Sequence, residues 1–341
     1  MKRNLLYLLI FAVLSLSVYF LVIKKTSGTL NEKEEAFGID DTIDIGKIFI
    51  ADMQGRSVVL ERSRDTWMVN GKYQVRDDYM KTLMSTLKRV QVSYPVPKAA
   101  EKTVVTNLAS NNKKVEIYNR RGELMKSYLV GGPTLNSQGT YMLLDGAKTA
   151  FVTAIPGFQG VLDSRYVTDE QVIRSPAIFR LRMNEISSVS VKYSDQPDSS
   201  FTISVLGPDS FNLENASGMM TKGERLSHER LQNYLRLFEF INCEGFQNDL
   251  SKKDTILQTR PFCTLTVIDR SRKEQTVVCY RMPVNSTSEE FDAKGNKLKY
   301  DVDRYFAAIN QGNDFVIVQH FHFGRLLKNF SYFLTREMSA V

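Results

Sequence analysis

Residues 65–90 read DTWMVNGKYQVRDDYMKTLMSTLKRV and combine a strand, a turn and a helix in one stretch. Thr66–Val69 has the composition of a strand, and Asn70-Gly71 predicts a hairpin turn because both residues tolerate a positive φ. After Asp77, the expected N-cap, apolar residues recur at spacings of three and four, which predicts an amphipathic helix. The stretch therefore predicts antiparallel strands covered on one face by a helix.

The same arrangement recurs in the second half of the chain. Five groups of residues match in order, and the separation between matched residues grows along the chain, as loop insertions in the second copy would cause. We interpret this pattern as an internal duplication. The matched residues are Ile45, Ile48 and Ile50 with Ile186, Val189 and Val191; Trp67 and Val69 with Phe211 and Leu213; Leu83, Leu87 and Val90 with Leu231, Leu235 and Phe238; Val115 and Ile117 with Leu265 and Val267; Tyr141 and Phe151 with Tyr305 and Phe315.

The N-terminus carries a long apolar segment. Residues 5–23 read LLYLLIFAVLSLSVYFLVI without a charge and would span roughly 28 Å as a helix, close to the thickness of a bilayer core. Lys24 and Lys25 follow with no small-residue cleavage site, which favours an uncleaved signal anchor over a cleaved signal peptide. We therefore expect a single-pass inner-membrane protein with its C-terminal part in the periplasm.

These observations predict an α+β fold. It comprises an N-terminal transmembrane helix at 1–25, a polar stalk at 26–42, and two duplicated modules of antiparallel sheet plus covering helix at 43–180 and 181–335. Short hairpin connections between the predicted strands are the reason for expecting antiparallel pairing.

Charge argues against a nucleic-acid partner. The chain has 45 Lys and Arg against 38 Asp and Glu, a net charge of +7. Lys2, Arg3, Lys24 and Lys25 account for part of that excess and flank the apolar segment. The remaining chain is close to balanced and shows a poor electrostatic footprint for nucleic acid.

One short run could supply metal ligands. His320-Phe321-His322-Phe323 ends a predicted strand, and alternation along a strand would put both imidazoles on one face. His320 and His322 are therefore candidate metal ligands. The alternative is a strand with one polar face and one buried aromatic face. The third histidine of the chain, His228, lies on a predicted helix.

Cys263 and Cys279 lie symmetrically about an expected hairpin tip, so they are candidate cross-strand neighbours. The sequence leaves two interpretations open: a disulfide in an oxidising compartment, or two small buried thiols. Cys243 is expected in the core. The sequence contains no CxxC, GxSxG, HExxH or phosphate-loop motif. We therefore predict no catalytic residue and no cofactor.

The chain resembles a bacterial envelope family catalogued as domain of unknown function 4340. The resemblance rests on the N-terminal apolar segment, on the opening strand pair with Ile45 and Ile48, and on the run WMVNGKY at 67–73. It implies an envelope protein, often encoded beside auxiliary components of ABC transporters, with no established catalytic residues. The second copy departs from this motif, with Phe211 in place of tryptophan and no Asn-Gly turn.

The sequence thus predicts a membrane-anchored, extracytoplasmic, non-enzymatic binding or scaffold protein. Its expected partners are the membrane and other inner-membrane or envelope proteins, and the resemblance adds a role as accessory to an ABC-type complex. Two alternatives stay open: a periplasmic hydrolase-like enzyme with a site between the modules, and a carrier that holds lipid or glycan in a groove.

Overall fold

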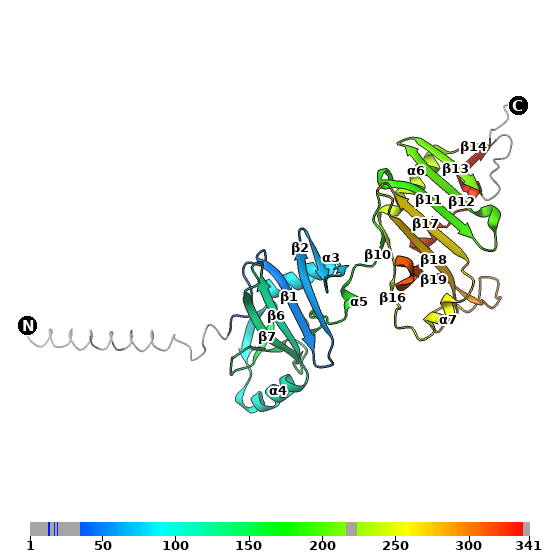
Figure 1. Ribbon diagram of the computed structural model, residues 1–341. Coiled ribbons are helices and arrows are strands. Elements are labelled where there is room, and N and C mark those ends of the chain that lie inside the picture. Colours follow the sequence, from blue (N-terminus) through cyan, green and yellow to red (C-terminus); the bar gives the residue numbers. More distant parts are fainter. Residues whose placement is uncertain (1–12, 14–16, 18, 20–34, 216–223, 337–341) are drawn as a thin grey trace, which may run out of the picture. The chain divides into compact units, whose positions relative to one another are not determined.

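The chain divides into two compact units, Met1–Ser175 and Pro176–Val341, called unit 1 and unit 2 below. The structure is a computed structural model, and it describes residues 13, 17, 19, 35–215 and 224–336. Each unit is built on one large antiparallel sheet (Figure 1).

The sheet of unit 1 has nine strands in the order β4-β3-β2-β1-β6-β7-β8-β9-β5. Burial alternates along its strands: in β2, Val58 and Leu60 are buried, whereas Glu61 is exposed. The strands are β1 (Ile45–Asp52), β2 (Ser57–Ser63), β3 (Thr66–Val69), β4 (Tyr73–Gln74), β5 (Gln91–Pro95), β6 (Lys113–Asn119), β7 (Leu124–Pro133), β8 (Thr140–Leu144) and β9 (Phe151–Ala154).

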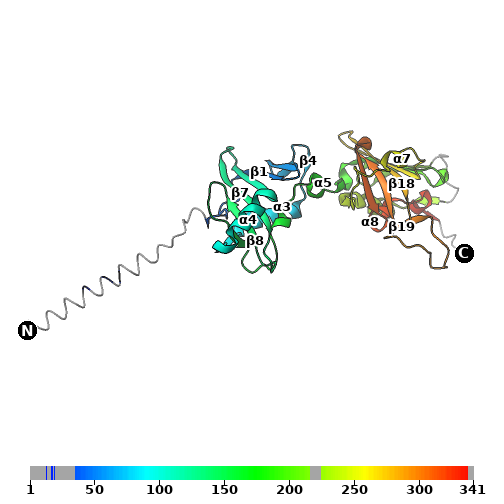
Figure 2. The same cartoon turned by 90° about the horizontal axis from the view of Figure 1, so that it is seen from below.

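Two helices cover opposite faces of this sheet. Helix α3 (Asp77–Arg89) packs Leu83 and Leu87 into the main core of unit 1, on the face that we call the inner face. Helix α4 (Lys98–Ser110) packs Val104 and Leu108 onto the other face, over β7 to β9 (Figure 2). The short helices η1 (Asp163–Arg165) and α5 (Glu170–Ile173) complete the unit.

The sheet of unit 2 has eight strands in the order β13-β12-β11-β17-β18-β19-β20-β16. Two further pairs, β10 with β15 and β14 with β21, lie outside it. The strands are β10 (Ala177–Phe179), β11 (Ile186–Tyr193), β12 (Phe201–Gly207), β13 (Ser210–Asn215), β14 (Glu224–Leu226), β15 (Ile241–Asn242), β16 (Gly245–Phe246), β17 (Cys263–Asp269), β18 (Glu274–Pro283), β19 (Tyr300–Ile309), β20 (Asp314–Gln319) and β21 (Leu334–Arg336).

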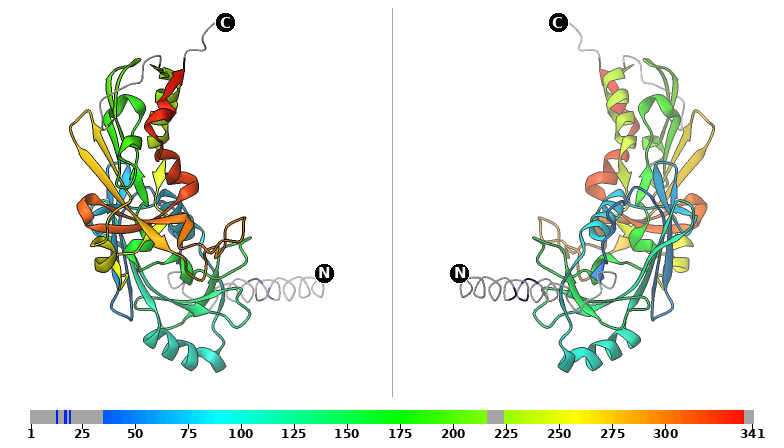
Figure 3. Two further views of the ribbon diagram at one scale, coloured as in Figure 1. Left: turned by 90° about the vertical axis from the view of Figure 1, so that its right-hand side faces the viewer. Right: turned by 90° about the vertical axis from the view of Figure 1, so that its left-hand side faces the viewer.

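The inner face of unit 2 is covered by α6 (His228–Arg236) and by the chain after β20. The ring of Tyr234 lies 5.8 Å from that of Phe201 and 5.1 Å from that of Phe333, centroid to centroid. Figure 3 shows α6 beside this red C-terminal segment in both views. The remaining helices are α7 (Lys253–Leu257), α8 (His320–Phe323), η2 (Met183–Glu185), η3 (Pro197–Ser199), η4 (Leu237–Glu239), η5 (Asn310–Gly312), η6 (Gly324–Leu326) and η7 (Phe330–Phe333).

The two sheets share one connectivity. The strands β3-β2-β1-β6-β7-β8-β9-β5 of unit 1 follow one another in space as β13-β12-β11-β17-β18-β19-β20-β16 do in unit 2. In each unit the inner-face helix lies in the chain between the two strands named as ends of this shared order: α3 lies between β3 and β5, and α6 lies between β13 and β16. Unit 1 carries one additional strand, β4, next to β3.

The prediction of an N-terminal membrane anchor does not stand. Within the described residues, no helix is long and apolar enough to cross a membrane. The predicted single-pass inner-membrane location, the periplasmic placement and the membrane partner depended on that anchor and are corrected with it. Of the apolar segment at 5–23, residues 13, 17 and 19 are described, and the others lie outside the described residues.

The predicted α+β class is also wrong, because strand (41%) clearly outweighs helix (25%) and the fold is mostly antiparallel β-sheet. The segment predicted as a polar stalk, 26–42, also differs from the prediction. Phe37 and Ile39 are buried in the core of unit 1, because both side chains are apolar and reach the inner face. The cap of α3 is Arg76, and Asp77 lies in the first turn, where its charge favours the helix N-terminus.

The inner-face helix should be essential to unit 1. Leu83 is fully buried, so Leu83→Ala should lower the free energy of unfolding by about 2–5 kcal/mol, because the cavity adds to the lost burial. Lys81→Ala, at an exposed position of the same helix, should change it by less than about 0.5 kcal/mol. Urea unfolding followed by tryptophan fluorescence measures both, and equal effects of the two variants would contradict this packing.

Candidate functional site

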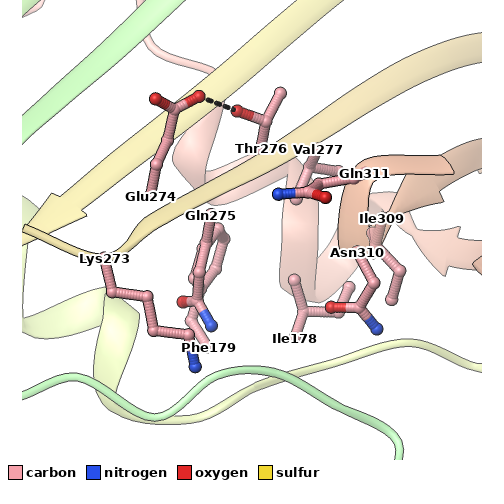
Figure 4. A pocket seen from close by; sticks show the side chains of 10 residues that line it. All are labelled: Ile178, Phe179, Lys273, Glu274, Gln275, Thr276, Val277, Ile309, Asn310 and Gln311. Carbon is pink, nitrogen blue, oxygen red and sulfur yellow. Dashed lines mark hydrogen bonds between the residues drawn. The ribbon is translucent and has the colours of Figure 1, made fainter. Parts of the chain in front are cut away.

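A pocket of about 640 Å³ opens in unit 2. Its walls come from β10, from the start of β18 and from the turn between β19 and β20 (Figure 4). It is a candidate binding site because it joins an apolar floor to several polar side chains. The lining residues are Ile178, Phe179, Lys273, Glu274, Gln275, Thr276, Val277, Ile309, Asn310 and Gln311.

Alternation along β18 decides which of its side chains reach the pocket. In Figure 4, Lys273 and Gln275 point to one side of the strand, toward Phe179. Glu274 and Thr276 point to the other side, where the Thr276 hydroxyl donates a hydrogen bond of 3.0 Å to Glu274. The polar side of the pocket therefore combines the amides of Gln275, Asn310 and Gln311 with the ammonium group of Lys273.

Gln275 occupies a position that belongs to the inner face. It lies directly opposite Val267 of β17, and residues directly opposite in an antiparallel pair share a face. Val267 and Val277 on this face are almost fully buried. A glutamine here places an amide against the core, at the end of the strand where the pocket opens.

The amide oxygen of Gln275 has no hydrogen-bond partner. Its Oε1 atom is buried, and within the described residues nothing donates to it. Leaving a buried acceptor unpaired costs about 1–3 kcal/mol, so such atoms are rare in folded proteins. A ligand with an O–H or N–H group in the pocket would remove this cost once the Gln275 side chain turns its oxygen toward the pocket.

The opposite wall is a strained turn. Asn310 and Gln311 adopt left-handed backbone conformations, with φ of 52° and 58°. Asparagine tolerates this conformation, but it is unfavourable for Gln311, and such strained residues concentrate at functional sites. The Asn310 amide donates a 2.7 Å hydrogen bond to the buried carboxylate of Asp314, which in turn accepts from Asn248 at 3.1 Å. This network holds the side chain of Asn310 in place.

The structure does not bring the two predicted histidine ligands together. Strand β20 ends at Gln319, and His320 begins the helical turn α8, so side chains two residues apart do not face each other. His320 Nδ1 lies 2.5 Å from the Tyr305 hydroxyl, whereas His322 packs against the ring of Phe321. The turn redirects the chain and buries Phe323. The described residues hold no group of three or more metal-ligating side chains.

The two predicted cysteine neighbours do lie directly opposite each other, on β17 and β18. Both are fully buried thiols, and this burial raises the pKa of Cys263 to about 12 and that of Cys279 well above its usual range. Cys243 is buried as well. Whether the facing pair is oxidised stays a prediction from the sequence.

Sequence reasoning missed Gln275 and Asn310. The signal for Gln275 was present, because the alternation that assigns Val277 and Cys279 to the core also assigns residue 275 to it. Asn310 carried no comparable signal, since its role depends on a turn whose conformation is set by Asp314.

No family model, no curated protein and no solved structure matches this chain. The resemblance to the family of unknown function therefore stays a prediction, and the site has to be interpreted from its own geometry.

The facing thiols should be unreactive in the folded protein. With a raised pKa and no solvent access, Cys263 and Cys279 should react with iodoacetamide at pH 8 at least about 100-fold more slowly than in urea. Mass spectrometry of labelled peptides measures both rates. Rapid labelling of the folded chain would contradict their burial, and labelling in urea that requires prior reduction would establish the disulfide.

Proposed function

We propose that this chain is a non-enzymatic binding protein whose unit 2 pocket takes a neutral, hydroxyl-rich ligand of the sugar type. The observation that carries the proposal is the buried Oε1 atom of Gln275, which lacks a donor among the described residues. A folded chain retains such an atom at a stability cost, and a ligand hydroxyl offsets that cost.

The other lining groups support a sugar. Amide side chains both donate and accept hydrogen bonds, as Asn310, Gln311 and Gln275 would do toward hydroxyl groups. Ile178 and Ile309, which keep a small exposed fraction, would face the C–H groups of a ring. A lipid chain would leave Gln275 Oε1 unpaired, so among carrier functions the pocket favours a glycan over a lipid.

The orientation of the lining carboxylate does not suit hydrolysis that depends on a carboxylate. General acid–base catalysis requires a titratable group within hydrogen-bond reach of the substrate. Glu274 is the carboxylate among the lining residues, and its side chain turns to the opposite face of β18, toward Thr276 (Figure 4). A scaffold role, and a role as accessory to an ABC-type complex, remain predictions from the sequence and the resemblance.

Replacing Gln275 should weaken sugar binding without lowering the free energy of unfolding. In the free protein, Gln275→Leu should keep the free energy of unfolding or raise it by about 1 kcal/mol, because it removes a buried unpaired acceptor. The same variant should weaken sugar binding at least tenfold. Calorimetric titration with maltose, cellobiose and N,N′-diacetylchitobiose, together with urea unfolding, measures both effects.

Thr276→Val is the matched control. Thr276 is the next residue, points away from the pocket and shares hydrogen bonds with Glu274 and Thr266. The control should lose about 1 kcal/mol of stability and keep the affinity of the wild-type chain. If none of the three sugars binds the wild-type chain, the proposed ligand class is wrong; if Gln275→Leu binds as tightly as wild type, the role of the amide is wrong.

A further inference from the structure

Both units carry a polar residue at the same place on the inner face. In unit 1, Lys126 of β7 lies directly opposite Ile117 of β6. In unit 2, Gln275 of β18 lies directly opposite Val267 of β17, and the internal duplication matches Val267 with Ile117. Both polar side chains are partly buried. Lys126 is therefore the counterpart of Gln275.

The segment before the first long strand is attached in the same way in both units. In unit 1 the N–H group of Ile39 donates a 2.9 Å hydrogen bond to the carbonyl of Leu87, in helix α3. In unit 2 the N–H group of Leu181 donates a 3.1 Å hydrogen bond to the carbonyl of Phe238, in the helical turn after α6. Ile39 and Leu181 are therefore counterparts.

Counting back from these donors pairs a second set of residues. Three residues before Ile39 stands Ala36, and three residues before Leu181 stands Ile178. Ile178 belongs to β10 and lines the pocket. Ala36 therefore occupies, in unit 1, the place that a pocket residue occupies in unit 2.

In unit 1 these two places are joined by a hydrogen bond. The ammonium group of Lys126 donates to the backbone carbonyl of Ala36 over 2.5 Å. The aliphatic stem of the lysine thereby spans from β7 to the segment before β1. In unit 2 the counterparts, Gln275 and Ile178, both border the pocket (Figure 4), and a glutamine side chain is shorter than that of lysine.

We infer that Lys126 is the built-in occupant, in unit 1, of the place that the ligand takes in unit 2. Residue 275 then determines whether this place is open. The shorter Gln275 leaves room beside Ile178, and an O–H group of the ligand lies where the ammonium group of a lysine would lie. The inference rests on the proposed function for the class of ligand. It adds that each chain binds one ligand, in unit 2.

The hydrogen-bonding capacity of the two side chains agrees with these roles. An ammonium group donates hydrogen bonds but accepts none, so Lys126 suits a closed contact with a carbonyl. A sugar hydroxyl both donates and accepts, and the amide of Gln275 can do the same. A glutamine at this place therefore suits a hydroxyl ligand, whereas a lysine replaces one.

Hydrogen exchange of the free protein tests the bridge without any ligand. In Gln275→Lys, the peptide 176–182 should exchange at least about threefold more slowly than in the wild-type chain, because the new ammonium group would tie β18 to β10. In Lys126→Met, the peptide 35–41 should exchange at least about threefold faster, because the hydrogen bond to Ala36 is lost. Mass spectrometry of pepsin fragments measures both rates.

Gln275→Met is the matched control, since methionine is of similar length and cannot donate. The peptide 176–182 should exchange in this variant as in the wild-type chain. Equal exchange of that peptide in Gln275→Lys and Gln275→Met would overturn the inference. So would an unchanged peptide 35–41 in Lys126→Met. Because the two lysine positions lie in different units, a variant that fails to fold leaves the other as a test.

Calorimetric titration tests the link to the ligand. For a sugar that the wild-type chain binds, we expect one sugar per chain. Gln275→Lys should weaken binding at least about 100-fold, more than the tenfold expected for Gln275→Leu, because the lysine fills the site. Two sugars per chain, or wild-type affinity in Gln275→Lys, would overturn the inference. If no sugar binds the wild-type chain, the proposed function is wrong, and the exchange rates alone decide whether a lysine closes this place.

Discussion

Each unit depends on the burial of one sheet face beneath a helix. Alternation along the strands puts every second side chain on that face, so Leu83 of α3 and Leu235 of α6 each meet a continuous apolar surface. A slip of one residue in any central strand would move its apolar set to solvent. This constraint fixes the register of β17 with β18, and thereby sets Cys263 opposite Cys279 and Gln275 opposite Val267.

One side chain that lines the pocket departs from that pattern. Gln275 stands at an inner-face position where the alternation calls for an apolar residue, and its amide oxygen is buried without a donor among the described residues. The neighbouring turn adds a second cost through the left-handed backbone of Gln311. Unpaired polar atoms and strained turns are tolerated where binding offsets them, so their coincidence in one pocket is stronger evidence than either alone.

Local signals in the sequence predicted local structure well. Asn70-Gly71 adopts the positive φ values that its turn requires, 52° and 64°, and Ser227 caps α6 by accepting from the amide of Arg230. The run from His320 to Phe323 was misjudged because four residues are too few to distinguish a strand from a helical turn. In the structure this run forms the helical turn α8, in which Phe323 is buried. The pocket could not be predicted, because β10 and the turn after β19 come from distant parts of the chain.

The two units share one strand order but differ at one end of their sheets. Unit 1 closes its sheet with β4, and the turn before β4 is anchored where the Asn70 amide donates a 2.6 Å hydrogen bond to Glu170. Unit 2 lacks the Asn-Gly turn, and β13 ends its sheet. The polar pocket therefore lies in the copy that departs from the motif. Among the described residues, buried polar atoms without a hydrogen-bond partner occur in both units, at Arg62 and Asp163 as well as at Gln275, so it is the pocket beside Gln275 that singles this atom out.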